Sequence, residues 1–151
     1  MKIFRITLGL SGDNLQVVEL LDEFTVPFFM MDSFKPDDYH KYIPSKKYGF
    51  GSILITNPKK FCNEDEVTNY EEWYLGFFEK YFEKMLKFGA EEFSLFIEVF
   101  YNGQCNFEIF DKEMLSRLAK YNVSLPISIY RLELSEINSM LNDAGLPTLG
   151  E

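Results

Sequence analysis

Apolar side chains alternate with polar or small ones over the first ten residues of the chain. The even positions from Phe4 to Leu10 are all apolar, and the odd positions between them are not. A period of two is typical of a β-strand with one buried face. The pattern stops at a Ser-Gly pair, so the sequence predicts a strand over residues 2–10.

The next segment changes to a helical period. Asp13 and Gln16 have the spacing of a helix N-cap and its reciprocal partner, and Pro27 prevents any continuation of the helix. A short helix is therefore predicted between Asp13 and Pro27. Its apolar stripe consists of Val17, Leu20, Leu21 and Phe24.

Residues 28–56 contain a short apolar run, a long loop and a second strand. The run Phe-Phe-Met-Met at residues 28–31 fits either a strand or a segment packed over the core. Residues 32–47 are polar and contain two prolines, which is typical of a loop. Residues 48–56 are predicted to form a strand that Asn57-Pro58 ends.

The clearest helix is predicted over residues 69–88. Thr68 and Glu71 have capping-box spacing, and Gly89 can adopt the positive φ of a helix C-terminus. The apolar arc is wider than a surface helix needs. We interpret it as a helix packed between the sheet and another element; the alternative is that part of the arc binds a partner. The apolar positions are Trp73, Tyr74, Leu75, Phe77, Phe78, Tyr81, Phe82, Met85 and Leu86.

A β-hairpin is predicted over residues 92–110, with its turn at Asn102-Gly103, because Asn-Gly favours a tight turn between strands. The apolar residues of the two arms share a face only if the loop holds an odd number of residues or the ladder contains a bulge. We favour that arrangement. It places Glu98 and Glu108 on the second face, among phenylalanines.

The remaining segments complete an α+β fold. Asp111 is predicted to cap a helix that ends at Asn122, residues 125–131 alternate as a strand, and residues 135–143 can form one more helix. Residues 145–151 are predicted to be a flexible tail. We expect a single domain over residues 1–151. Its fold is a single-layer mixed, mostly antiparallel sheet with helices packed on it, in the order β-α-β-α-β-β-α-β-α.

The charge of the chain disfavours several functions. Its formal net charge is −9, and nucleic-acid affinity depends on Lys and Arg. Residues 35–60 nevertheless carry a net charge of +4, whereas residues 63–92 carry −6. No apolar stretch approaches the roughly 20 residues of a membrane span, and the first residues do not resemble a signal peptide. We therefore expect a cytoplasmic protein with no nucleic-acid or membrane partner.

Few residues offer catalytic chemistry. His40 is the only imidazole and lies beside Asp37 and Asp38, a group that could hold a metal or form a solvated loop. Glu98 and Glu108 could form an acid–base pair if they were buried, or could be ordinary solvent-facing strand residues. We favour the second interpretation in both cases, and predict no enzyme activity, no metal and no cofactor.

The two cysteines are too few and too far apart for a disulfide framework or a zinc site, which needs about four ligands. Cys105 falls in the second arm of the predicted hairpin and is expected to be a small core residue. Cys62 falls in a polar loop and could be exposed.

Residues 10–15, Leu-Ser-Gly-Asp-Asn-Leu, lead from the first predicted strand into a helix. This segment resembles the opening of a bacterial domain family of unknown function, which has a Ser-Gly-acidic-x-Leu turn at that place. Residues 107–119 and 123–130 are similar to the terminal strand–helix–strand of the same family. The resemblance implies a fold and a bacterial source, and it supplies no catalytic residue.

A small acidic domain without catalytic groups is similar in class to the immunity proteins that neutralise secreted bacterial toxins. We therefore predict a non-enzymatic protein-binding domain whose partner is a basic cognate toxin, for example a nuclease of a contact-dependent inhibition system. The alternative is a small-molecule-binding or regulatory domain with a cleft between helix 69–88 and the sheet. The predicted partner-binding residues are Glu64, Asp65, Glu66, Glu71, Glu72 and Trp73.

Overall fold

One sheet holds the six strands found in residues 1–148, the part of the chain that the computed structural model describes. The strands are β1 (Lys2–Gly12), β2 (Phe29–Phe34), β3 (Gly51–Thr56), β4 (Cys62–Asn63), β5 (Glu92–Tyr101) and β6 (Ile127–Arg131). They lie in the order β2-β3-β1-β5-β6, and the short β4 also pairs with β1. Only β5 and β6 are parallel among these pairs. The predicted α+β fold with a mixed, mostly antiparallel sheet is confirmed.

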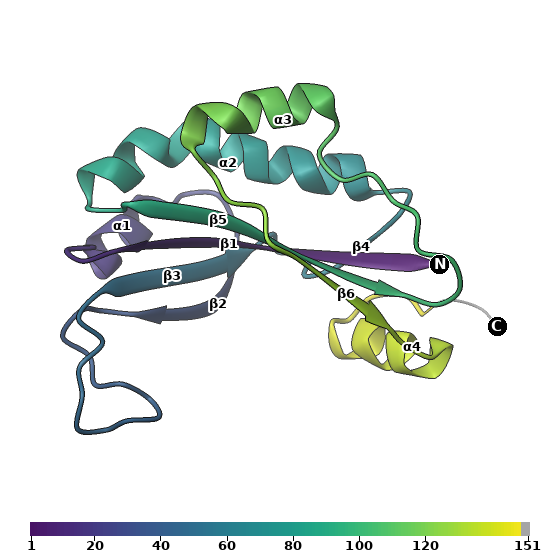
Figure 1. Ribbon diagram of the computed structural model, residues 1–151, viewed down its shortest axis with the longest axis horizontal. Helices are drawn as coiled ribbons and strands as arrows, with labels where there is room; N and C mark the ends of the chain where they lie inside the picture. The colour runs from purple at the N-terminus through teal and green to yellow at the C-terminus, as the bar shows by residue number, and fades with distance from the viewer. Residues whose placement is uncertain (149–151) are drawn as a thin grey trace.

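The helices cover the two faces of this sheet unequally (Figure 1). They are α1 (Val17–Glu23), α2 (Val67–Lys87), α3 (Lys112–Leu118), which continues into the 3₁₀ turn η1 (Ala119–Tyr121), and α4 (Leu134–Asp143). The main core lies where α1, α2 and α3 pack on one face, and a smaller apolar cluster lies under α4 on the other. Within the described residues, the rest of this second face has no helix over it.

The long helix α2 is enclosed by the sheet and by its neighbours. Its sheet-facing residues Tyr74 and Phe78 are fully buried. The ring of Phe24, which follows α1, packs against Phe77 with the centroids 4.8 Å apart. Tyr121 stacks on Phe78 from the α3 side at 5.2 Å. The wide apolar arc therefore belongs to a helix packed between the sheet and other elements, as predicted.

The three buried tyrosines of α2 bind backbone groups through their hydroxyls, and Tyr70 donates to the carbonyl of Lys60 at 3.0 Å. Tyr74 donates to the carbonyl of Ile6 in β1 and accepts from the N–H of Asn57 at 3.0 Å. The hydroxyl of Tyr81 accepts from the N–H of Thr25 at 2.9 Å. A buried polar group without a partner costs about 1–3 kcal/mol. These bonds therefore allow α2 to bury large rings that carry oxygen.

Two glycines allow the end of β1 to approach the end of α2. Gly89 has a φ of +94°, as predicted for the residue after this helix. A Cβ atom at Gly12 would lie 2.0 Å from the carbonyl oxygen of Gly89, so a side chain does not fit there. The N–H of Gln16 donates to the carbonyl of Phe88 at 2.9 Å and joins α1 to the same corner.

The predicted helix caps have different outcomes. Asp13 does not cap α1, which begins only after Gln16. The side chain of Glu71 does not bind back to the start of α2 but accepts from the N–H of Phe110. Asp111 does cap α3, and its carboxylate accepts from two N–H groups at 2.9 Å. The two wrong predictions are at places where contacts with distant segments replace the local one.

The prediction of a second hairpin arm after the turn at residues 102–103 is wrong. Residues 102–110 leave the sheet, because β1 and β6 already occupy the two edges of β5. The chain instead crosses to the helical face, forms α3 and returns as β6, since a parallel partner requires a crossover. Phe107 packs edge-on against Phe4 at 5.9 Å, so the second arm packs on the core from outside the sheet.

The connection between β2 and β3, residues 35–50, projects from one end of the sheet (Figure 1). A β-bridge joins Tyr39 to Lys47, and the ring of Tyr48 stacks on Phe34 with the centroids 3.7 Å apart. The apolar run at 28–31 contributes to a strand, one of its two predicted alternatives. The loop consequently begins and ends three residues later than predicted.

Residues 145–148 of the predicted flexible tail follow α4 closely. The N–H of Leu146 donates to the carbonyl of Leu141 at 2.8 Å, and the Leu146 side chain packs on the apolar cluster under α4. Residues 149–151 of that tail lie outside the described part of the chain.

Replacing Phe78 by Ala should lower the free energy of unfolding by about 3–5 kcal/mol, because the ring is fully buried and its loss leaves a cavity. The matched control is Leu86→Ala on the exposed side of the same helix, which should change stability by no more than about 0.5 kcal/mol. Urea unfolding of the two variants measures this difference. Equal losses would contradict the burial described for α2.

Candidate functional site

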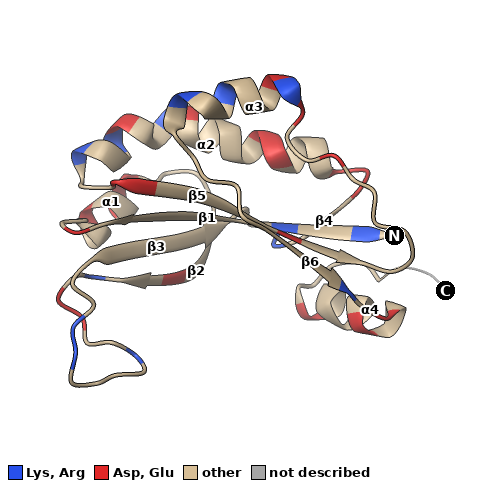
Figure 2. Cartoon of the chain, viewed as in Figure 1, with Lys and Arg blue, Asp and Glu red and all other residues tan. Residues whose placement is uncertain are grey.

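The predicted acidic residues gather around the N-terminal end of α2 (Figure 2). Glu64 and Asp65 lie in the turn between β4 and α2, and Glu66 occupies the N-cap position. Glu71 and Glu72 follow in the second turn of the helix. The helix dipole favours the carboxylates that directly precede the first turn of α2.

The structure brings two further carboxylates to this cluster. Glu108 and Asp111 lie in the crossover between β5 and α3, and the negative charges of both raise the pKa of Glu71. The sequence does not indicate this position for either residue, because Glu108 falls in the predicted second arm of the hairpin and Asp111 is predicted only as a helix cap. We call the exposed carboxylates among these residues the acidic surface; they are Glu64, Asp65, Glu72, Glu108 and Asp111, with Glu66 half-buried beside them.

Basic side chains neutralise part of the acidic surface. Lys2 pairs with Glu64 at 2.5 Å, and Arg117 pairs with Glu72 at 2.9 Å. The half-buried Glu66 is paired with Lys59. In the described part of the chain, no ion pair involves Asp65, Glu108 or Asp111. The acidic surface therefore keeps an excess of negative charge that can act on a partner.

Glu71 does not belong to the exposed surface, and its predicted exposure is wrong. The residue is only 4% exposed, and its carboxylate accepts a hydrogen bond from the N–H of Phe110 at 2.6 Å. Burial raises the pKa of Glu71, the hydrogen bond from Phe110 opposes this shift, and the nearby Asp111 and Glu108 increase it. Glu71 thus joins α2 to the crossover before α3.

Trp73 is half-buried on the flank of α2. Its ring lies 4.8 Å from the Tyr74 ring and 5.2 Å from the Phe77 ring, measured between centroids. The exposed part lines a hollow of about 220 Å³ beside Gly76 and Lys80. The indole therefore contributes mainly to packing, with one edge accessible from outside.

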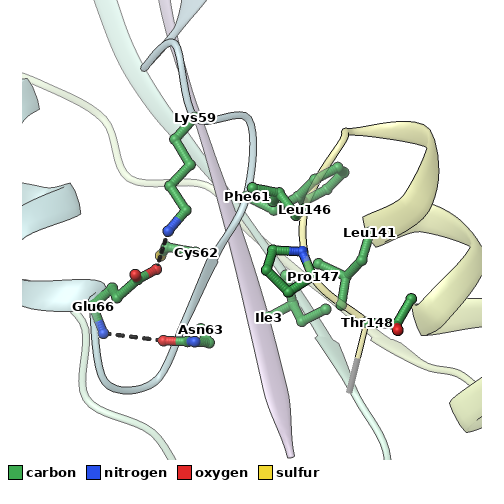
Figure 3. A pocket seen from close by; sticks show the side chains of 10 residues that line it. All are labelled: Ile3, Lys59, Phe61, Cys62, Asn63, Glu66, Leu141, Leu146, Pro147 and Thr148. Carbon is green, nitrogen blue, oxygen red and sulfur yellow. Dashed lines mark hydrogen bonds and ion pairs between the residues drawn. The ribbon is translucent and has the colours of Figure 1, made fainter. Parts of the chain in front are cut away.

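A smaller pocket of about 160 Å³ lies beside the acidic surface, where β4, the start of α2 and the residues after α4 meet (Figure 3). The Lys59–Glu66 ion pair forms one wall, and apolar side chains that include Phe61 and Leu141 form the opposite wall. Its volume is below the roughly 300–1,000 Å³ of ligand pockets.

Cys62 lies in the wall of this pocket and is buried, contrary to the exposure considered from the sequence. Burial raises the pKa of its thiol to about 12, so the reactive thiolate is scarce at neutral pH. Cys105 is half-buried in the crossover and packs against the main core.

The second face of the sheet contains an ion pair among aromatic rings. The guanidinium of Arg5 binds Glu98 through two hydrogen bonds of 2.5 and 2.8 Å. Phe61 and Phe100 lie within 5.8 Å of this guanidinium. Glu98 is therefore held by Arg5 on this face, whereas Glu108 lies in the crossover near Glu71, so the two do not form a carboxylate pair.

A larger hollow of about 410 Å³ lies next to Arg5, between α4 and β2. Its lining is mostly apolar and sulfur-containing, with two cations and one carboxylate. The lining residues are Arg5, Phe29, Met30, Met31, Lys60, Phe61, Met140, Asp143 and Ala144.

His40 lies in the β2–β3 connection and its ring has local partners. Its Nδ1 accepts from the N–H of Tyr42 at 3.1 Å, and its ring packs against Tyr48 at 4.7 Å. Within residues 1–148, no cluster of three His, Cys, Asp or Glu side chains has the arrangement of a metal site.

The cleft predicted between helix 69–88 and the sheet is not formed at the centre of α2. Tyr74, Leu75, Phe78 and Met85 are fully buried against neighbouring elements. A ligand could enter there only by displacing these side chains.

Comparison with known proteins gives no match: no protein-family model, no curated protein and no solved structure is significantly similar to this chain. Among the helices of the described residues, none combines the length and the apolar character that crossing a bilayer requires.

Glu71→Gln should be more stable than the wild type at pH 7, because the amide can still accept from Phe110 but carries no buried charge. A carboxyl whose pKa is raised on folding binds its proton more tightly in the folded state. Stability therefore falls as the pH rises from about 4.3, the ordinary pKa of Glu, through the raised value. Urea unfolding at several pH values should show the gap between the two proteins closing below about pH 4.

The companion variant Glu71→Ala should be about 1–3 kcal/mol less stable than Glu71→Gln at every pH, because neither side chain titrates and in the Ala variant the buried N–H of Phe110 is left without an acceptor. A gap between wild type and Glu71→Gln that does not depend on pH would contradict this account of Glu71.

Proposed function

We propose that the protein is a non-enzymatic binding domain that neutralises a basic protein partner through the acidic surface, in the manner of a bacterial immunity protein. The observation that carries the proposal is the convergence of carboxylates from two separate segments, the start of α2 and the crossover before α3. Only part of their charge is neutralised by ion pairs.

The distribution of charge over the molecule supports a partner that approaches in one orientation. The basic β2–β3 connection and the acidic surface lie toward opposite ends of the molecule's long axis (Figure 2). A basic partner is therefore attracted to one end and repelled by the lysines of the other. Such steering increases the association rate over roughly a Debye length, about 8–10 Å at physiological salt.

The buried carboxylates also favour binding over catalysis. Glu98 is held by Arg5, and Glu71 is held by the N–H of Phe110. Both therefore have structural partners in place of a substrate. A toxin that acts on nucleic acid is a suitable basic partner, since such enzymes neutralise phosphates with Lys and Arg. This proposal places the protein in the bacterial cytoplasm, where the toxin would act.

The product of the neighbouring gene is the first partner to test. If it is a toxin, co-expression of this chain should restore the growth of cells that produce it, and the two purified proteins should form a stable complex. A neighbouring toxin that still kills in the presence of this chain, and does not bind it, would contradict the proposal.

Reversing the charges of Asp65 and Glu108 to Lys should slow association with the basic partner several-fold at low salt. Neither side chain has an ion pair in the described structure, so the fold should tolerate the change. The effect should shrink toward 1 M salt, where the Debye length is about 3 Å, because charges at the rim act mainly on encounter. Stopped-flow association rates over a range of ionic strengths measure it.

The matched control reverses two exposed residues, Glu91, which directly precedes β5, and Glu92, its first residue. It changes the net charge equally but away from the acidic surface. Equal slowing by both double variants would show that net charge acts without a particular site.

A small-molecule function is the second candidate, and it is favoured by the 410 Å³ hollow between α4 and β2. Its size lies within the range of ligand pockets. A screen of metabolites by thermal stabilisation distinguishes the two functions. Stabilisation that Met140→Trp abolishes by filling the hollow would favour the small-molecule function.

A further inference from the structure

The outer edge of β6 is exposed and carries apolar side chains. In the part of the chain that the structure describes, β6 pairs only with β5. Ile127 is 49% exposed, Ile129 52% and Tyr130 41%. A free, apolar strand edge is a template for pairing with another strand, and folded proteins usually protect such edges.

The opposite edge of the same sheet, strand β2, has features that hinder pairing with another strand. β2 has an irregularity in its pairing with β3 between Met30 and Asp32, which disturbs a regular ladder. It also carries the Asp32 carboxylate, and the ammonium of Lys60 lies 3.9 Å from the centre of the Phe29 ring. By contrast, β6 pairs with β5 in unbroken register, and its only charged residue is Arg131 at the end.

The backbone of β6 is directed so that it can accept a further strand. The N–H and C=O of Ser124 bind Phe93 and Leu95 of β5, and the N–H of Leu132 binds Tyr101. In a parallel pair, alternate residues direct their backbone groups to the same neighbour. The odd residues Ile127, Ile129 and Arg131 therefore direct theirs away from β5, to the outer edge.

We propose that β6 pairs antiparallel with β6 of a second copy of this chain, so that the two sheets join into one. The two-fold axis passes beside Ile129, which lies opposite the partner's Ile129. Ile127 then lies opposite the partner's Arg131. In this register, each of the three outward-directed residues forms a hydrogen-bonded pair with a residue of the partner. The interface is isologous, so the assembly is complete with two copies.

The chemistry of the strand suits a second copy in particular. At the axis an isoleucine meets an isoleucine, and the only charged residue faces an apolar side chain, so like charges do not meet across the ladder. Tyr130, held by stacking on Phe100 at 5.2 Å, lies opposite the partner's Ser128. The net charge of −9 on each copy opposes the association, so salt should strengthen the dimer.

Sedimentation velocity over a range of concentrations tests this pairing with the purified chain, independently of the basic partner. We expect the wild type to form a dimer of the 17.8 kDa chain whose population rises with salt. Ile129→Lys should restore the monomer, because two ammonium groups would face each other at the axis. The matched control Met31→Lys, at an exposed position of the β2 edge, should remain a dimer.

A cysteine at the axis tests the register. In a Cys105→Ser background, Ile129→Cys should form a disulfide-linked dimer on mild oxidation, because Cα atoms of hydrogen-bonded pairs lie about 5.5 Å apart. Ile127→Cys should not, since it faces the partner's Arg131. Circular dichroism verifies that each variant is folded. A wild type that stays monomeric at high salt and concentration, or a folded Ile129→Lys variant that still dimerises, would overturn the proposal.

Discussion

The contact between α2 and the central strand β1 is the interaction on which the rest of the structure depends. β1 pairs with three other strands, so the sheet is assembled around it. α2 supplies most of the large rings that cover its apolar face, and the bond from Tyr74 to the carbonyl of Ile6 joins helix and strand at the centre. The position of α2 also determines where its N-terminal carboxylates lie, and therefore where the acidic surface forms.

The buried polar groups on the two faces of the sheet differ in their hydrogen-bond partners. On the helical face, buried polar atoms are tyrosine hydroxyls and Glu71, and they bind backbone groups of neighbouring segments. On the other face, Arg5 and Glu98 bind each other directly between aromatic rings. Since α4 covers only one end of that face, this pair remains partly accessible to water, which lowers the cost of burying its charges.

Local sequence patterns were sufficient to predict single strands and helices. They do not specify which of these elements pair with one another. Period-two alternation found β1 and β6, and helical periodicity with Gly89 found α2 and its end. The Asn102-Gly103 pair led to the wrong prediction of a β-hairpin, because a turn pattern does not indicate which strands flank β5. That choice is made by β1 and β6, which are distant in the sequence. The part of the acidic surface at the start of α2 was predicted because its residues are close together in the sequence. Glu108 and Asp111 reach it only through the crossover that replaces the predicted hairpin.

The central position of β1 has a consequence for synthesis of the chain. Leu8 pairs with Ile55 of β3 and with Leu95 of β5, so the strand that leaves the ribosome before its partners is also the one that needs all of them. At about 5–20 residues per second, its apolar face waits for several seconds before α2 and β5 exist. The nascent chain must keep this segment from aggregating during that time, and its alternating Arg5, Thr7 and Gly9 interrupt what would otherwise be a continuous apolar run.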